Sequence, residues 1–232
     1  MKKTLFFISS FILVSFLSGC NQPEITNSKI VQNDGIYNYY KGKTNEKIKK
    51  VYITTQNGNI IDGQYDGVEF MTTSPALLSE ENSLVTIELS NDKKIEKNIT
   101  FKKRKPIDSY KLFSEKMNLF LSSINENAKT KFPKTMNDGT SIVSNENGVI
   151  TNINVQDSQV VGMNMSTKGD ANQEMASIIV SFQSAYDASN NGVSEAYNNT
   201  LESKKENSFS SGGYLFTFSY NGDDLVSDII KE

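Results

Sequence analysis

Residues 214–230 read YLFTFSYNGDDLVSDII, and this stretch decides the fold of the second half of the chain. Its aromatic residues recur at every second position, so an extended strand places all of them on one face. Asn221-Gly222 favours a tight hairpin turn, and Leu225 to Ile230 can return as the second strand. The stretch therefore predicts an antiparallel hairpin whose apolar face must be covered by other elements.

The segments before this hairpin predict the helices that cover it. Apolar residues recur at helical spacing over residues 110–128, and Asp108 is a suitable N-cap for this helix. Asp170 would cap a second helix. Asn191-Gly192 would break that helix, and a shorter helix would follow it.

Strands separate these helices. Residues 141–155 predict a β-hairpin, and residues 159–165 predict a further strand. Residues 106–232 are therefore predicted to be an α+β domain with helices packed on an antiparallel sheet, in the order leading helix, β-hairpin, helices, β-hairpin.

Residues 34–105 show a different pattern, with short alternating segments and frequent turns. About six or seven strands at a spacing of 8–12 residues are typical of a small antiparallel β-sandwich. The likeness is immunoglobulin-like only in a generic sense, because the sequence has no Cys-Trp-Cys core. Residues 20–33 are polar and without periodicity, which predicts a tether. The overall fold class expected is α+β, and the strand topology of residues 34–105 stays open.

The N-terminus carries a transport signal. Lys2 and Lys3 precede an apolar run over residues 5–17 that is shorter than the roughly 20 residues a membrane span needs. Leu17-Ser18-Gly19-Cys20 then resembles the lipobox of bacterial lipoproteins. The resemblance implies that residues 1–19 are a cleaved signal peptide and that Cys20 carries the lipid, including palmitate-like acyl chains. An uncleaved membrane helix with an incidental Cys is the alternative.

This resemblance implies a protein held on a cell membrane and facing away from the cytoplasm. The abundance of Asn, Lys and Ile favours a Gram-positive surface, and the periplasmic face of a Gram-negative membrane is the alternative. The membrane is therefore one expected partner, reached through the lipid on Cys20.

Composition excludes several kinds of chemistry. The chain has no His, no Trp and one Cys, so Ser-His-Asp, Cys-His and zinc catalysis are excluded and no intrachain disulfide can form. The formal net charge is −3, and residues 133–232 hold 13 acidic residues against 5 Lys. This balance does not suggest nucleic acid as a partner. No catalytic residue, cofactor or metal is expected.

Three stretches were weighed as chemical motifs. Ser90-Asn91-Asp92-Lys93 matches the S-x-x-K dyad, but it bridges two predicted strands as an ordinary turn, whereas the dyad needs a helix. Asp187 to Gly192 resembles half of a calcium-binding EF-hand loop. The twelfth position of that loop is Asn198 rather than Glu, so a helix-to-helix turn is the competing interpretation. Asp223, Asp224 and Asp228 flank a turn and predict a solvated face.

Two further stretches have surface interpretations. Lys102, Lys103, Arg104 and Lys105 form a cationic run that could contact an anionic partner or dock against the acidic second domain. The alternative is a charged edge strand that prevents aggregation. Tyr37, Tyr39, Tyr40 and Tyr52 could form either a binding platform or part of a core that lacks Trp.

These observations predict a lipid-anchored extracytoplasmic lipoprotein that acts as a non-enzymatic binding or interaction module of the cell envelope. Its partner would be an envelope protein, a polymer or an exported peptide. One alternative is an immunity or exclusion lipoprotein that protects against a bacteriocin, a phage or conjugation. A second alternative is an envelope hydrolase that works without His, and a cleft holding a perturbed carboxylate pair would favour it.

Overall fold

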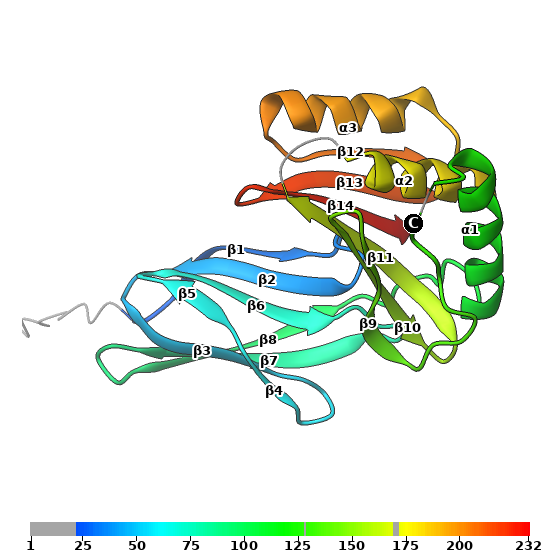
Figure 1. The fold of residues 1–232 in the computed structure, drawn as a ribbon. Helices are drawn as coiled ribbons and strands as arrows, with labels where there is room; N and C mark the ends of the chain where they lie inside the picture. The colour runs from blue at the N-terminus through cyan, green and yellow to red at the C-terminus, as the bar shows by residue number, and fades with distance from the viewer. Residues whose placement is uncertain (1–21, 128, 169–171) are drawn as a thin grey trace, which may run out of the picture.

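The structure, a computed structural model, describes residues 22–127, 129–168 and 172–232. These residues form a mixed α+β fold with three helices and three antiparallel sheets (Figure 1). The fold class predicted from the sequence is confirmed at this level. The lipobox with Cys20, and also Asp170, lie outside the described residues.

Two four-stranded sheets are built from residues 25–101. The first has the order β1-β2-β6-β5 and the second has the order β4-β3-β7-β8. Their strands are β1 (Ile25–Val31), β2 (Tyr37–Thr44), β3 (Ile48–Thr54), β4 (Ile60–Asp62), β5 (Gln64–Asp66), β6 (Glu69–Pro75), β7 (Glu81–Leu89) and β8 (Lys94–Phe101). Gly58 and Gly67, in turns of this region, have φ of 81° and 60°, a conformation that glycine adopts at no steric cost.

One hydrophobic cluster joins these two sheets. It contains Tyr40 and Phe70 from the first sheet and Ile53, Ile87 and Phe101 from the second, all less than a tenth exposed. Burial of these side chains from both sheets supplies the main stabilising free energy of this part of the chain.

The second half of the chain forms a six-stranded sheet of order β12-β13-β14-β11-β10-β9. Its strands are β9 (Gly139–Glu146), β10 (Val149–Gln156), β11 (Gln159–Lys168), β12 (Asn207–Ser211), β13 (Tyr214–Asn221) and β14 (Asp224–Lys231). The two predicted hairpins therefore share one sheet, joined where β11 pairs with β14. Strand β12 was not predicted from the sequence, because this short edge strand consists of one Asn and three Ser around a single Phe.

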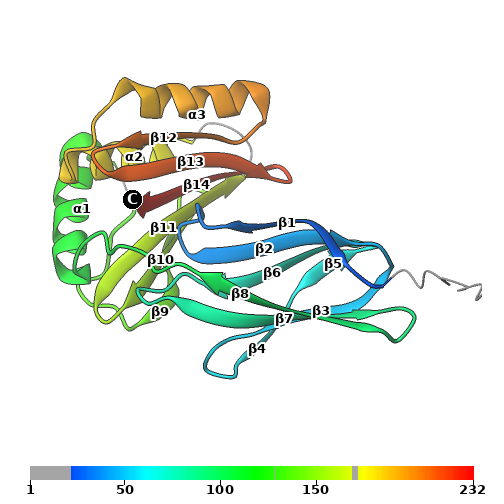
Figure 2. The same ribbon diagram turned by 180° about the vertical axis from the view of Figure 1, so that it is seen from behind.

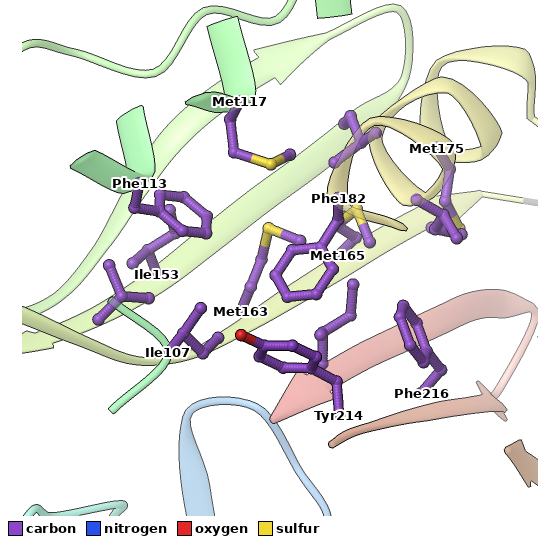
Figure 3. Close-up of a cluster of buried hydrophobic side chains, with 14 of the residues drawn as sticks. Ile107, Phe113, Met117, Ile153, Met163, Met165, Met175, Phe182, Tyr214 and Phe216 are labelled. Carbon is purple, nitrogen blue, oxygen red and sulfur yellow. The ribbon is translucent and has the colours of Figure 1, made fainter. Parts of the chain in front are cut away.

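Three helices, α1 (Tyr110–Ile124), α2 (Gln173–Ala185) and α3 (Asn191–Ser203), cover one face of this sheet. Phe113 and Met117 of α1 meet Phe182 of α2 over Met163 and Met165 of β11 (Figure 3). The aromatic residues of the opening stretch complete this core, because Phe216 and Phe218 are fully buried.

Three details of the sequence prediction were wrong. The expected tether contains β1, which pairs with β2 although five of its seven side chains are exposed; its backbone hydrogen bonds leave no hydrophobic signature in the sequence. Helix α1 is capped by Ser109 instead of Asp108 and ends at Ile124. Helix α2 is capped by Asn172, whose side chain accepts from the N–H groups of Glu174 and Met175.

The uncovered face of the six-stranded sheet meets the segment between β1 and β2 (Figure 2). Gly35 lies so close to β11 that a Cβ atom built on Gly162 would lie 1.8 Å from the Gly35 carbonyl oxygen. Asn154 of β10 donates to the carbonyl oxygens of Ile36 and Ala76, at 3.4 and 2.7 Å. Backbone contact at two glycines thus fixes how the halves of the chain meet.

We expect Gly162→Ala to separate this contact, because the added methyl group has no room beside a backbone carbonyl. The expected loss is about 1–3 kcal/mol of unfolding free energy, measured by urea denaturation of the full chain in detergent. Ser208→Ala, at an exposed position on β12, is the control and should change stability by less than about 0.5 kcal/mol. Equal stability of both variants would contradict the contact.

Candidate functional site

A cleft of about 520 Å³ lies beside this contact, between the outer face of the β1-β2-β6 strands and the uncovered face of the six-stranded sheet. Tyr37, Tyr39 and Lys41 line it from β2. Asp34 lines it from the segment before β2, and Lys204 and Glu206 line it from the segment after α3, where the Glu206 Oε1 accepts from the Asn33 Nδ2 at 3.2 Å. Both halves of the chain therefore contribute to one site.

A row of polar side chains crosses the sheet, and Asn164, Asp228 and Thr217 of this row form the floor of the cleft. Asn152, Asn164, Asp228 and Thr217 are successive cross-strand neighbours on β10, β11, β14 and β13. The Asn152 Nδ2 lies 3.4 Å from the Asn164 Oδ1, and the Asn164 Nδ2 donates to the Asp228 Oδ1 at 2.7 Å. Alternation along each strand places this row opposite the apolar face that packs on the helices.

Two carboxylates organise the closed end of the cleft. The Asp228 Oδ1 also accepts from the Gly35 N–H at 2.8 Å, so it links β14 to the segment before β2. The Asp34 Oδ1 accepts from the N–H groups of Ile36 and Tyr37, both at 2.8 Å, and its Oδ2 accepts from the Tyr39 hydroxyl at 2.6 Å. Every oxygen of Asp34 is thus engaged in shaping the turn.

At the closed end of the cleft, the charge of Asp34 makes a second negative charge unfavourable. Burial, reinforced by the nearby charge of Asp34, raises the pKa of Asp228 to about 8. Burial and the same aspartate also raise the pKa of Tyr39, so it remains a neutral donor. No ion pair among the described residues includes Asp34 or Asp228.

Arg104 is the cation that lies behind this pair, and it is 7% exposed. Its Nη2 donates to the carbonyl oxygens of Asp34 and Tyr37, at 3.2 and 3.3 Å, and to the Asn38 Oδ1 at 3.0 Å. Burial lowers its pKa to about 10 while the two aspartates oppose that shift. Arg104 therefore holds the turn through neutral acceptors and only partly balances the carboxylates.

Thr217 adds an unsatisfied group to the floor of the cleft. It is 3% exposed, and its hydroxyl has no hydrogen-bond partner within the described ranges. It is the direct cross-strand neighbour of Asp228 and lines the cleft. A buried hydroxyl without a partner is costly, at about 1–3 kcal/mol, so a ligand that bonds it would recover that free energy.

The structure corrects two sequence predictions at this site. Asp223 is exposed and Asp224 is half-buried, but Asp228 is 5% exposed and does not belong to a solvated face. Of the predicted cationic patch, Lys102, Lys103 and Lys105 are exposed whereas Arg104 points inward. The Lys105 Nζ donates to the Glu232 carbonyl oxygen at 2.6 Å, so one end of the run contacts the second half of the chain, and an anionic partner for the lysines stays a prediction.

The other candidate motifs lie away from the cleft. Ser90 to Lys93 is an exposed turn between β7 and β8, as predicted. Asp187 to Gly192 joins α2 to α3, and Asn190, which is not a predicted calcium ligand, caps α3. A Cβ atom on Gly192 would lie 2.3 Å from the Phe209 ring, so close packing explains this glycine. Tyr40 is buried in the core, whereas Tyr37 and Tyr39 face the cleft.

No protein-family model matches the chain, and no curated protein and no solved structure is significantly similar to it. Across residues 22–127, 129–168 and 172–232, no helix is long and apolar enough to cross a membrane. The same residues contain no group of three or more acidic, His or Cys side chains that could hold a metal ion.

Asp228 provides a direct test of the electrostatics. Because its pKa rises on folding, its contribution to stability is present below the unfolded value near pH 4 and is lost as the pH rises through about 8. Asp228→Asn keeps an acceptor oxygen for Gly35. Between those pH values we expect the variant to gain stability relative to the wild type, by up to about 1.4 kcal/mol per pH unit.

Urea denaturation of the full chain across this pH range measures the effect. Asp224→Asn is the matched control, because it removes the same formal charge four residues earlier on β14, at a half-buried position. Parallel pH profiles for the wild type and Asp228→Asn would show that Asp228 titrates alike in the folded and unfolded chain.

Proposed function

We propose that this protein is a lipid-anchored extracytoplasmic binding module of the bacterial cell envelope, and that its ligand occupies the cleft between the two halves of the chain. The observation that carries the proposal is the cleft itself. It combines a row of polar side chains, tyrosine rings and an unsatisfied buried hydroxyl, and convergent polar groups in a concave site can fix the orientation of a ligand.

The same proposal includes a division into two domains, residues 34–105 and 106–232. Its support is that the hydrophobic clusters separate, one ending at Phe101 and the other beginning at Ile107. We further propose that the two four-stranded sheets form a β-sandwich, immunoglobulin-like in the generic sense, because they share a single core.

The proposed role is binding without catalysis. The pair of Asp34 and Asp228 meets part of the criterion for a hydrolase, since the pKa of Asp228 is raised. However, all of the hydrogen-bonding oxygens of Asp34 are taken by the turn and by Tyr39, so it has no oxygen directed at a substrate. A general acid paired with a carboxylate that is occupied in this way lacks the second group that glycoside or peptide hydrolysis requires.

The anchor is tested through Cys20. We expect Cys20→Ala to remove lipidation, so that the protein is released from membranes or accumulates as the unprocessed precursor. Membrane fractionation with mass measurement of the mature chain gives the readout, and Ser18→Thr, which keeps the cysteine, is the control. A Cys20→Ala protein that stays membrane-bound at the mature size would falsify the anchor.

The cleft is tested by capture of a partner from the envelope of the source cell, with the detergent-solubilised full chain as bait. Ser219 lines the cleft, so Ser219→Phe should fill it and abolish capture. Ser208→Phe adds the same ring at an exposed position on β12 and should leave capture unchanged. If both variants retain the partner equally, the ligand binds at another surface.

A further inference from the structure

At the closed end of the cleft Arg104 only partly balances the charge of two aspartates, which leaves a place for a further positive group. Asp34 and Asp228 repel each other there, and no ion pair in the described part of the chain includes either of them. Beside them, the Thr217 hydroxyl is buried and unsatisfied. A hydrogen-bond donor with positive charge would satisfy both deficits at once.

The walls of the cleft already accommodate ammonium groups. The Lys41 Nζ lies 5.2 Å from the centroid of the Tyr39 ring. On the opposite wall the Lys204 Nζ lies 4.2 Å from the Tyr220 ring centroid and donates to the Tyr220 hydroxyl at 2.8 Å. All four residues line the cleft, and tyrosine faces attract cations through their ring quadrupole.

The shape of the site selects among cations. Asp228 and Thr217 are 5% and 3% exposed, so the group that reaches them must be narrow. A primary ammonium on an extended alkyl chain is compact and has three donors, whereas a guanidinium is a broad planar fork. The described residues also lack the three clustered ligands that a metal ion would need.

We propose that the cleft binds a primary ammonium group, carried on a flexible alkyl chain, through the carboxylate of Asp228 and the hydroxyl of Thr217. This inference rests on the proposed function and names the chemical class of its ligand. A polyamine and a lysine side chain of a peptide both carry this group. The ammonium donates to one oxygen of Asp228 and to the Thr217 Oγ1, while Asp34 adds long-range attraction.

Binding should release protons, which gives a signature specific to the buried carboxyl. Arg104, Asp34 and Tyr39 are the charged and titratable groups around Asp228. Just below pH 8 roughly half of the Asp228 carboxyl groups are protonated in the free protein. A bound cation favours the ionised form, so its arrival expels the proton into the buffer.

The test is isothermal titration calorimetry of the full chain in detergent, just below pH 8, in two buffers of different ionisation enthalpy. Spermidine and trilysine are the probes. We expect saturable binding with release of a fraction of a proton. Binding of spermidine alone assigns the site to polyamines, and binding of trilysine alone assigns it to lysine-bearing peptides; either result supports the ammonium site.

Three variants locate the site. Asp228→Asn should abolish proton release and weaken binding about tenfold or more. Thr217→Val should weaken binding several-fold and keep proton release. This variant still tests the site if Asp228→Asn does not fold. Asp223→Asn, which removes a charge at an exposed position that does not line the cleft, should keep both affinity and proton release.

Failure of this inference is separable from failure of the proposed function. If neither amine binds, or if Asp228→Asn binds them as tightly as the wild type, the ammonium site is wrong. Calcium binding with proton release, in the absence of amine binding, would assign the carboxylates to an inorganic cation and overturn it too. The proposed function would still stand if the envelope partner were captured by the wild type and lost with Ser219→Phe.

Discussion

The structure depends on one hydrogen bond, which the Gly35 N–H donates to the buried carboxyl of Asp228. It joins the first ordered turn of the chain to the last strand, across the close contact of Gly35 with Gly162. The pair of glycines lets the two backbones approach, and the aspartate satisfies an N–H that this approach removes from water. Any larger residue at either glycine would separate the halves and open the end of the cleft.

This arrangement keeps a carboxyl in a place where its charge is poorly solvated. Asn164 and Gly35 hydrogen-bond to Asp228 and favour its ionised form, but burial and the charge of Asp34 outweigh them, so its pKa is raised. Arg104 does not remove the conflict, because its Nη2 donates to carbonyl and amide oxygens instead of to a carboxylate. An asparagine would hold the same turn without this penalty, so the carboxyl costs stability that the turn alone does not require.

The sequence predicts the elements much better than the site. Alternating aromatics from Tyr214 to Tyr220 and the Asn-Gly turn after them specify β13 and β14, because burial of one face enforces a period of two. Strand β1 has no such pattern, since its pairing uses backbone groups only. The prediction that Asp228 belongs to a solvated face failed for a related reason. Proximity to a turn suggested exposure, whereas the burial of Asp228 is decided by the segment 34–36, nearly two hundred residues away in the chain. Only the alternation of Asp224, Val226 and Asp228 against Leu225 and Ile229 signalled that the aspartates share a face.

The uncovered face of the six-stranded sheet carries cross-strand rows of residues, and their arrangement explains why a cleft exists where a second hydrophobic core would be expected. A sheet with helices on one face can bury its other face only against apolar or complementary surface. Here the row that contains Gly162 is covered by the backbone of Gly35. The next row, with Asn164, Asp228 and Thr217, carries polar groups that would lack hydrogen-bond partners if an apolar surface packed on them. The sheets must therefore diverge beyond Gly35, and the space between them is filled by water or by a ligand that can hydrogen-bond. The same polar row that prevents the two halves from closing is the surface that a ligand entering the cleft would meet.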